Sequence, residues 1–275
     1  MMKKIAIQGI QGSNHHIAAK KHYNNEIFIN ECLSFDALTD SLLQKESDEA
    51  VMAIENTIAG SIIPNYALID KYNLNITGEY YLPIHHHLMA LPGQKLTDIK
   101  EVCSHPMALL QCKEFFKKHP FIKLVEDVDT SAVAKTIKHQ KLNGVAAIAP
   151  KIAAEIFNLK ILEDEIQTIK NNETRFVILQ IEKPINNIKQ INKASLRFEL
   201  EHQRGSLATV LNVMSDCQLN LTKIQSLPII ETPWKYAFFV DVTFKQYENY
   251  IKAKSIIEIM ANNFKILGEY KNGRI

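Results

Sequence analysis

The sequence is poor in the features that mark several classes of protein. Its 275 residues include only four cysteines, which are far apart and lack any CxxC spacing (Cys32, Cys103, Cys112 and Cys217). This excludes a disulfide-dense secreted scaffold and favours reduced thiols. No stretch approaches membrane-spanning length, and the apolar run after the basic N-terminus is too short for a signal peptide or an anchor. We therefore expect a cytoplasmic protein with no membrane partner.

Strong charge of either sign is also missing. The formal net charge is +2, and the lysines and arginines are scattered rather than clustered. Such a surface offers no electrostatic footprint for nucleic acid. With 46% hydrophobic residues the chain can bury one large core or two modest ones. The expected partners are small molecules or further copies of the chain.

Strand and helix patterns alternate through the first part of the chain. Lys3–Gln8 predicts a buried strand, Gly9–Gly12 a tight turn, and Ser13–His22 a helix. The order recurs after the strands predicted at 50–54, 101–104 and 144–149 and after the LVEDV run. This alternation predicts an open, largely parallel α/β sheet. Residues 76–93 alternate like one or two strands and could carry the chain from one lobe to another.

The last third of the chain has a different organisation. The polar, proline-bearing residues 183–193 predict a linker, and residues 194–275 predict the order βαββαβ, which is ferredoxin-like. We therefore expect a two-lobed domain over residues 1–182, with a second lobe at about 79–160, and a separate domain after the linker.

Polar residues gather where the predicted strands meet helix N-termini. Such ends bind anions, because free backbone N–H groups and the positive end of the helix dipole lie there. Helix capping alone explains any one of these residues, but their accumulation predicts a site. The residues are Gly12, Ser13, Glu55, Asn56, Thr57, Ser104, Gln111 and Thr130.

Three other motifs are weaker. The GxxG turn lacks the full GxGxxG pattern and the acidic residue of a dinucleotide site. The run His85–His87 has no nearby Asp, Glu or Cys in sequence to complete a metal site, so we expect structural histidines. We expect His15 and His16 to be solvated at a helix start, the alternative being that one of them faces a cleft. We expect Cys112 to be a small buried apolar residue.

Taken in series, the motifs resemble the prephenate dehydratase family over nearly the whole chain. They are Gly9–Gly12, Glu55–Ser61, Ser104–Pro106 with Gln111 and Cys112, Asp129–Thr130, and Asn172 with Thr174–Phe176. The C-terminal βαββαβ unit resembles an ACT regulatory domain. The resemblance implies a fold like a type II periplasmic binding protein with the site in the cleft between lobes. Because no chorismate mutase helix precedes Met1, the resemblance is to the monofunctional form.

The resemblance also implies chemistry and roles. The family converts prephenate to phenylpyruvate, water and carbon dioxide without a cofactor, on the route to phenylalanine. Thr174 would be the proton donor to the departing ring hydroxyl, and Glu55 a second donor. Arg175 would bind a carboxylate or hold its loop, and Phe176 would pack. The substrate-binding residues would be Gly12, Ser13, Asn56, Ser104, Gln111, Asn172 and Arg175.

This sequence departs from the family pattern in the first loop. Ile10, Asn14 and His15 replace a proline, an aromatic residue and a hydroxyl residue, so either His15 takes over a contact or the contact is missing. Met107 replaces an amide after Ser104–Pro106, although Gln111 is kept.

The resemblance implies L-phenylalanine as an effector and a homodimer or homotetramer. In the ACT region Gln225 and Leu227 replace a glutamate and an arginine, so an ACT-like unit that only dimerises is the alternative. The effector-binding residues would be Gly205, Ser206, Leu207, Ala208, Leu219, Asn220, Leu221, Ser226 and Pro228.

Two other functions stay open on sequence grounds. Arogenate dehydratase is one, because arogenate differs from prephenate only by an amine in place of the side-chain keto group. A small-anion sensor without chemistry is the other. The Thr174–Arg175 pair beside Glu55 favours an enzyme, because a passive receptor has no special need for it.

Overall fold

The structure is a computed structural model that describes residues 2–24, 26–183, 188–229, 232 and 235–274. The chain forms two compact units, one of Met1–Gly60 with Tyr81–Phe176 and one of Ser61–Tyr80 with Val177–Ile275. The second unit therefore includes residues 61–80, which lie inside the segment predicted as catalytic. The predicted linker 183–193 includes residues 184–187, which lie outside the described residues. Among the helices described, none has the length and apolar character needed to cross a bilayer.

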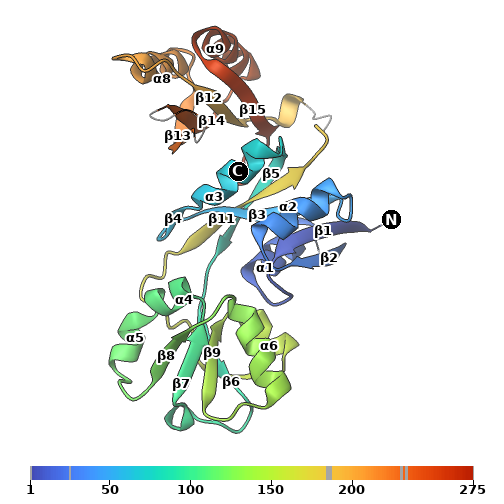
Figure 1. The fold of residues 1–275 in the computed structure, drawn as a ribbon, viewed down its shortest axis with the longest axis vertical. Helices are drawn as coiled ribbons and strands as arrows, with labels where there is room; N and C mark the ends of the chain where they lie inside the picture. Colours follow the sequence, from blue (N-terminus) through green and yellow to red (C-terminus); the bar gives the residue numbers. More distant parts are fainter. Residues whose placement is uncertain (1, 25, 184–187, 230–231, 233–234, 275) are drawn as a thin grey trace. The chain divides into compact units, whose positions relative to one another are not determined.

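The first sheet has the strand order β2-β1-β3-β11-β5, with β4 paired to β3 (Figure 1). Strands β2 and β3 both run parallel to β1, as the alternating pattern predicts. The strands are β1 (Lys3–Gln8), β2 (Ile27–Cys32), β3 (Glu49–Asn56), β4 (Gly60–Ser61), β5 (Asn75–Pro83) and β11 (Glu173–Gln180). The helices of this part are α1 (Asn14–His22), α2 (Phe35–Leu43) and α3 (Ile63–Lys71).

The second sheet has the order β10-β6-β9-β7-β8. Its strands are β6 (His87–Ala90), β7 (Glu101–Ser104), β8 (Lys123–Glu126), β9 (Val145–Ala149) and β10 (Lys160–Glu163). A short 3₁₀ helix, Leu96–Asp98, precedes β7, and the α-helices are α4 (Pro106–Gln111), α5 (Lys113–Lys117), α6 (Thr130–Gln140) and α7 (Lys151–Ile156).

Each face of the second sheet has its own hydrophobic core. Leu88, Ala146 and Ile148 pack with residues of α4 and α5, whereas Met89 and Ala147 pack with residues of α6 and α7. Side chains alternate between the two faces of a strand, so a continuous apolar run serves both helical layers. This is why Leu88–Ala90 of β6 and the whole of β9 are apolar.

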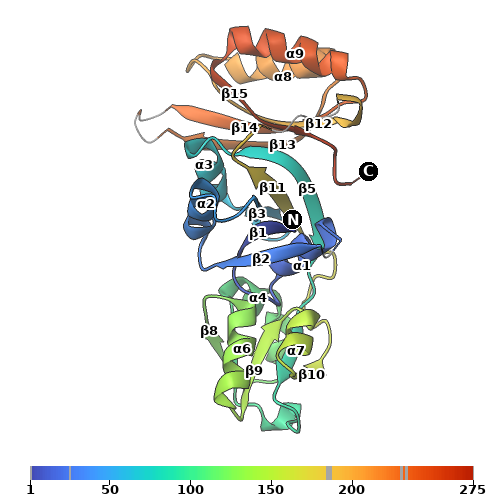
Figure 2. The same ribbon diagram turned by 90° about the vertical axis from the view of Figure 1, so that its right-hand side faces the viewer.

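The C-terminal sheet is antiparallel, with the order β13-β14-β12-β15. Its strands are β12 (Lys193–Glu199), β13 (Asn220–Pro228), β14 (Tyr236–Thr243) and β15 (Asn262–Tyr270). A second 3₁₀ helix, Ile188–Gln190, precedes β12, and the helices α8 (Ser206–Asp216) and α9 (Tyr247–Met260) lie on one face of the sheet (Figure 2). This is the predicted βαββαβ order.

The opposite face of β12 is polar but buried. Ala194, Leu196 and Phe198 point into the core with α8 and α9, whereas Lys193 and Arg197 point away from it and are still buried. These two cations pair with acidic groups of the segment 61–80. The Lys193 ammonium contacts Glu79, and Arg197 contacts Asp70. Residues 61–80 thus pack on the C-terminal sheet through ion pairs.

The predicted α/β class, the two lobes and the C-terminal ferredoxin-like unit are confirmed. Two expectations about detail are wrong. The second sheet is mixed rather than largely parallel, because β6 runs antiparallel to both β9 and β10. Asn56 and Thr57 do not open a helix, because β3 continues through Asn56 and α3 begins only at Ile63.

Candidate functional site

The hydroxyl of Thr174 is held by the side chain of Asn56. Asn56 Nδ2 donates to Thr174 Oγ1 over 2.9 Å. The orientation of this amide is fixed, because Asn56 Oδ1 accepts from the backbone N–H groups of Ile58 (3.0 Å) and Ala59 (2.9 Å). An amide nitrogen cannot accept a hydrogen bond, so Thr174 must accept here and keeps its own proton for another acceptor.

The turn after β3 holds β3 and β11 together at this point. The Thr57 N–H donates to the Glu173 carbonyl (2.9 Å), and the Glu173 N–H donates to Thr57 Oγ1 (3.0 Å). Glu55 lies at the same end of β3 and is partly exposed. Thr57 therefore supports the site instead of capping a helix.

The hydrogen bonds continue from Asn56 into the second lobe. Asn56 Nδ2 also donates to Asn172 Oδ1 (2.7 Å), and Asn172 Nδ2 donates to Gln111 Oε1 (2.8 Å). Gln111 Oε1 lies 2.7 Å from Nε2 of His86. Asn172 is buried, and both the oxygen and the nitrogen of its amide are hydrogen-bonded to neighbouring side chains. It is therefore better placed to orient these neighbours than to contact a ligand. The structure thus joins predicted residues from three separate motifs.

Arg175 and Phe176 have different surroundings from Thr174. Arg175 is buried, and successive side chains of a strand point to opposite faces, so its side chain leaves β11 on the face away from Thr174. That placement favours the second of its two predicted roles, holding the loop. The Phe176 ring packs edge to face against His15, with centroids 4.9 Å apart. Phe176 packs, as predicted.

The expectation of solvated histidines in the first helix is wrong. His15 and His16 are both buried. His15 Nε2 accepts from the Ala53 N–H (3.3 Å), and burial lowers the pKa of His15 to about 3, so its ring is neutral. His16 Nδ1 accepts from the Gly12 N–H (3.0 Å). Each imidazole satisfies a backbone donor, and the apolar surroundings of His15 could not be read from its neighbours in sequence.

The first loop lies against the second lobe. Gly9 and Gly12 have φ angles of 86° and 94°, which strongly favour glycine. A Cβ on Gly9 would lie 2.8 Å from Asp129 Oδ2, and one on Gly12 would lie 3.3 Å from the backbone of Ala153. Asp129 caps α6 through the N–H groups of Ser131 and Ala132, so the cap is Asp129 and not Thr130. Burial raises the pKa of the Asp129 carboxyl.

The two predicted serines are engaged within the protein. Ser104 is fully buried and donates to the carbonyl of Ile148 (2.7 Å), and Ser13 caps α1 by accepting from the His16 N–H (3.2 Å). Of the residues predicted to catalyse the reaction or bind the substrate, those that are partly exposed are Glu55, Asn56, Gln111 and Thr174. These four are therefore best placed to meet a ligand.

Each of the three consecutive histidines contacts a polar side chain, and one of them reaches the site. His85 and His87 lie near carboxylates that are distant in sequence, Glu165 at 3.3 Å and Asp164 at 3.0 Å. No cluster of three or more potential metal ligands occurs among the described residues. Sequence reasoning missed the contact of His86 with Gln111, because nothing in a run of histidines distinguishes its middle member.

Gln111 also lines a pocket of about 290 Å³. The pocket is bounded by residues of α4, α5 and the segment that returns to β11, and its volume approaches that of small-molecule sites. Its lining residues are Ile58, Leu110, Gln111, Lys113, Glu114, Thr168 and Ile169.

In the part of the chain that the structure describes, two of the predicted effector residues share a pocket. Ser206 and Leu207 line a pocket of about 130 Å³ beside Tyr236 and Phe238. Ser226 and Pro228 pair with these last two residues across the sheet, but Asn220 pairs with Thr243 at the other end of β13. The predicted set is therefore split between two ends of one strand.

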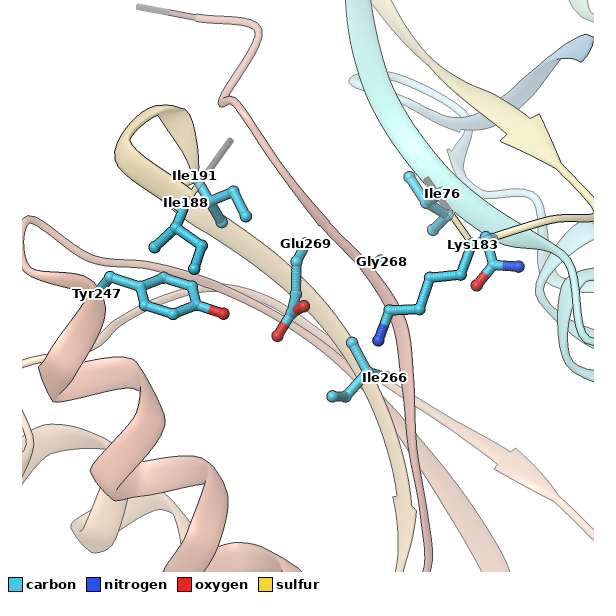
Figure 3. A pocket seen from close by; sticks show the side chains of 9 residues that line it. Ile76, Lys183, Ile188, Ile191, Tyr247, Ile266, Gly268 and Glu269 are labelled. Atoms are coloured by element: carbon cyan, nitrogen blue, oxygen red, sulfur yellow. The ribbon is translucent and has the colours of Figure 1, made fainter. Parts of the chain in front are cut away.

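A different pocket in the C-terminal unit, of about 110 Å³, contains none of the predicted effector residues. Glu269 and Lys183 extend toward its centre beside Tyr247, with isoleucine side chains around them (Figure 3). The buried Tyr250 hydroxyl donates to Glu269 Oε1 (2.7 Å), which fixes this carboxylate.

Known proteins with sequences similar to this chain include dehydratases. The chain is 35% identical to arogenate dehydratase/prephenate dehydratase 2, chloroplastic, of Arabidopsis thaliana, over 97% of this chain and 72% of that protein. Two solved structures share its fold, each with a TM-score of 0.89. One is the prephenate dehydratase of Arthrobacter aurescens in complex with L-Phe, which is 23% identical over 98% of this chain and 90% of that one. The other is GqqA, described as a novel type of quorum quenching acylase, which is 24% identical over 98% of both chains. The family profile for prephenate dehydratase matches residues 5–184, so the chain belongs to the prephenate dehydratase family of carbon–oxygen lyases.

Proposed function

We propose that this protein converts prephenate to phenylpyruvate, with the Thr174 hydroxyl as the proton donor to the leaving group. The observation that carries the proposal is the fixed Asn56 amide, which makes Thr174 an acceptor and leaves its proton available. In the reaction the bond from the ring to its carboxylate breaks and its electrons enter the ring. The ring hydroxyl departs with a proton, and the products are water, carbon dioxide and an aromatic ring.

A threonine hydroxyl is a weak acid. It can therefore donate its proton only as negative charge develops on the departing oxygen. Aromatisation supplies much of the driving force, and the donor has to share its proton and later recover one. Glu55 lies one residue from Asn56 at the same strand end and is the second candidate donor. Gln111 Nε2 remains for a substrate carboxylate, because the Oε1 atom of this amide already accepts from Asn172 and contacts His86.

The test compares prephenate and arogenate as substrates for the purified protein. We expect phenylpyruvate to form from prephenate with a higher kcat/KM than phenylalanine forms from arogenate. The relative from Arabidopsis carries both activities in its name, so a preference for arogenate is the second candidate. Turnover of neither substrate, in a protein that melts cooperatively, would contradict both dehydratase assignments and favour a sensor.

We also propose that L-phenylalanine is an effector and that two copies of the chain are needed to bind it. The predicted effector residues of β13 lie at its two ends, so a second copy can complete each half-site. Calorimetry is expected to show saturable binding of L-phenylalanine below millimolar concentration, with sedimentation as a dimer or tetramer. A monomer, or no heat at millimolar L-phenylalanine, would remove this part of the proposal.

The cytoplasmic location stays a prediction that cell fractionation tests.

A further inference from the structure

His86 lies on one of the two segments that connect the lobes of the first unit. The segment between β5 and β6 carries it, and its residue exposure is only 4%. Its backbone is fixed on both sides, because its N–H donates to Gln167 Oε1 (3.0 Å) and its carbonyl accepts from the Ile166 N–H (2.8 Å). The backbone that carries the ring is therefore held in place independently of the hydrogen bond to Gln111.

The hydrogen-bonding role of the ring follows from its partner. Gln111 Oε1 accepts from Asn172 Nδ2, so the atom that faces His86 Nε2 is an oxygen and Nε2 must carry a proton. Nδ1 has no hydrogen-bond partner in the part of the chain that the structure describes. Burial lowers the pKa of His86, in agreement with a neutral ring that is protonated on Nε2.

The chain of contacts from His86 to Thr174 cannot pass a proton. Its intermediate members, Gln111, Asn172 and Asn56, are amides, which do not exchange protons along a hydrogen-bond chain at neutral pH. Each of them can only fix the orientation of the next. The Gln111 oxygen orients Asn172, and the Asn56 nitrogen orients Thr174. Between them, the Asn172 oxygen adds a further contact to the Asn56 amide, which the N–H groups of Ile58 and Ala59 also hold.

We propose that His86 is a positioning residue for the dehydration step, one that holds the Gln111 amide and, through Asn172 and Asn56, keeps the Thr174 proton directed at the leaving oxygen. The inference rests on the proposed function. It assigns His86 no contact with substrate. Without the Nε2–H group the Gln111 amide can rotate, and Asn172 loses a fixed acceptor. The expected consequence is a lower kcat, because small misplacements of a reacting group are costly.

The test uses His86→Phe, which keeps a ring of similar shape without the donor, and His87→Phe as its matched control. His87 is adjacent, also buried (6% exposed), and contacts Asp164 outside the chain of amides. We expect kcat on the better substrate to fall by roughly 10- to 100-fold in His86→Phe, with KM changed less. His87→Phe should lose stability comparably but keep kcat within about threefold of the wild type, since no described contact links it to Thr174. His86→Gln restores an N–H donor and should recover part of the loss.

A double-mutant cycle with Gln111→Leu separates positioning from packing. If His86 acts through Gln111, then His86→Phe should lower kcat far less in the Gln111→Leu background than in the wild type. Equal losses of kcat in the two backgrounds, a loss no greater than that of His87→Phe, or an unchanged kcat in His86→Phe would each overturn the inference. The wild type is assayed alongside. An inactive wild type contradicts the proposed function, whereas an active wild type with an unaffected His86→Phe contradicts only the role of His86.

Discussion

Replacing Thr174 with alanine is expected to lower kcat by about 10²- to 10⁴-fold, the usual contribution of a positioned proton donor. The fold should survive the change. Thr174 is only partly buried, and Asn56 Nδ2 keeps two other acceptors, Asn172 Oδ1 at 2.7 Å and the Glu173 carbonyl at 3.2 Å. No buried donor is therefore left without a partner. Steady-state turnover on the preferred substrate and the melting temperature are the two measurements.

Two further variants make the result specific to the hydroxyl. Thr174→Ser keeps the hydroxyl and should retain most of the activity, whereas Thr174→Val keeps the branched shape and should behave like alanine. Wild-type turnover in either Thr174→Ala or Thr174→Val would show that another group, with Glu55 as the first candidate, donates the proton. A large loss of melting temperature in Thr174→Val alone would indicate packing of the added methyl group.

Much of the fold could be predicted because its signals are local. Lys3–Gln8 is a strand with the predicted bounds, and the C-terminal strands and helices follow the predicted order. The spacing of hydrophobic residues along a strand or helix can be recognised from that segment alone, without knowing which segments pack against it. The direction of β6 was missed because pairing depends on which strand lies beside it, and no residue within β6 encodes that.

The site was predicted as a set of residues but not as an arrangement. Asn56 and Thr174 were both expected to meet a ligand, and the structure shows that one also orients the other. The contact of His86 with Gln111 could not be predicted, because the two residues are 25 positions apart in the chain. Side-chain orientation of this kind is decided by long-range hydrogen bonds, and composition or spacing carries no record of it.

The polar face of β12 illustrates the same limit. Polar and apolar residues alternate along Lys193–Glu199, a pattern typical of a strand with one face in solvent. The polar face is instead buried, because the segment 61–80 supplies Asp70 and Glu79 to meet its cations. Nothing within either segment identifies the other, although each contains the charges that the other needs.

Replacing Lys193 with methionine is expected to lower the free energy of unfolding by about 3 to 5 kcal/mol, because it removes the ammonium group that contacts both oxygens of the buried Glu79 carboxylate. The Lys193 ammonium lies 2.9 and 2.8 Å from the two Glu79 oxygens, and the side chains are 3% and 0% exposed. Urea unfolding followed by circular dichroism measures the loss. Lys265→Met is the matched control, because Lys265 pairs with Asp70 of the same segment over 2.7 Å but is 41% exposed. Its loss should stay below about 1 kcal/mol.

The double variant Glu79→Gln/Lys193→Met separates the charge from the shape. Glutamine keeps an oxygen for the Gly273 N–H, which lies 3.0 Å from Glu79 Oε1, and methionine fills much of the volume of lysine. With both charges removed, most of the stability lost in Lys193→Met should return, even though one more residue has changed. A double variant as unstable as Lys193→Met would mean that packing around residue 193 dominates. A single variant within about 0.5 kcal/mol of the wild type would mean that Glu79 does not depend on this cation, since even ordinary surface changes reach that size.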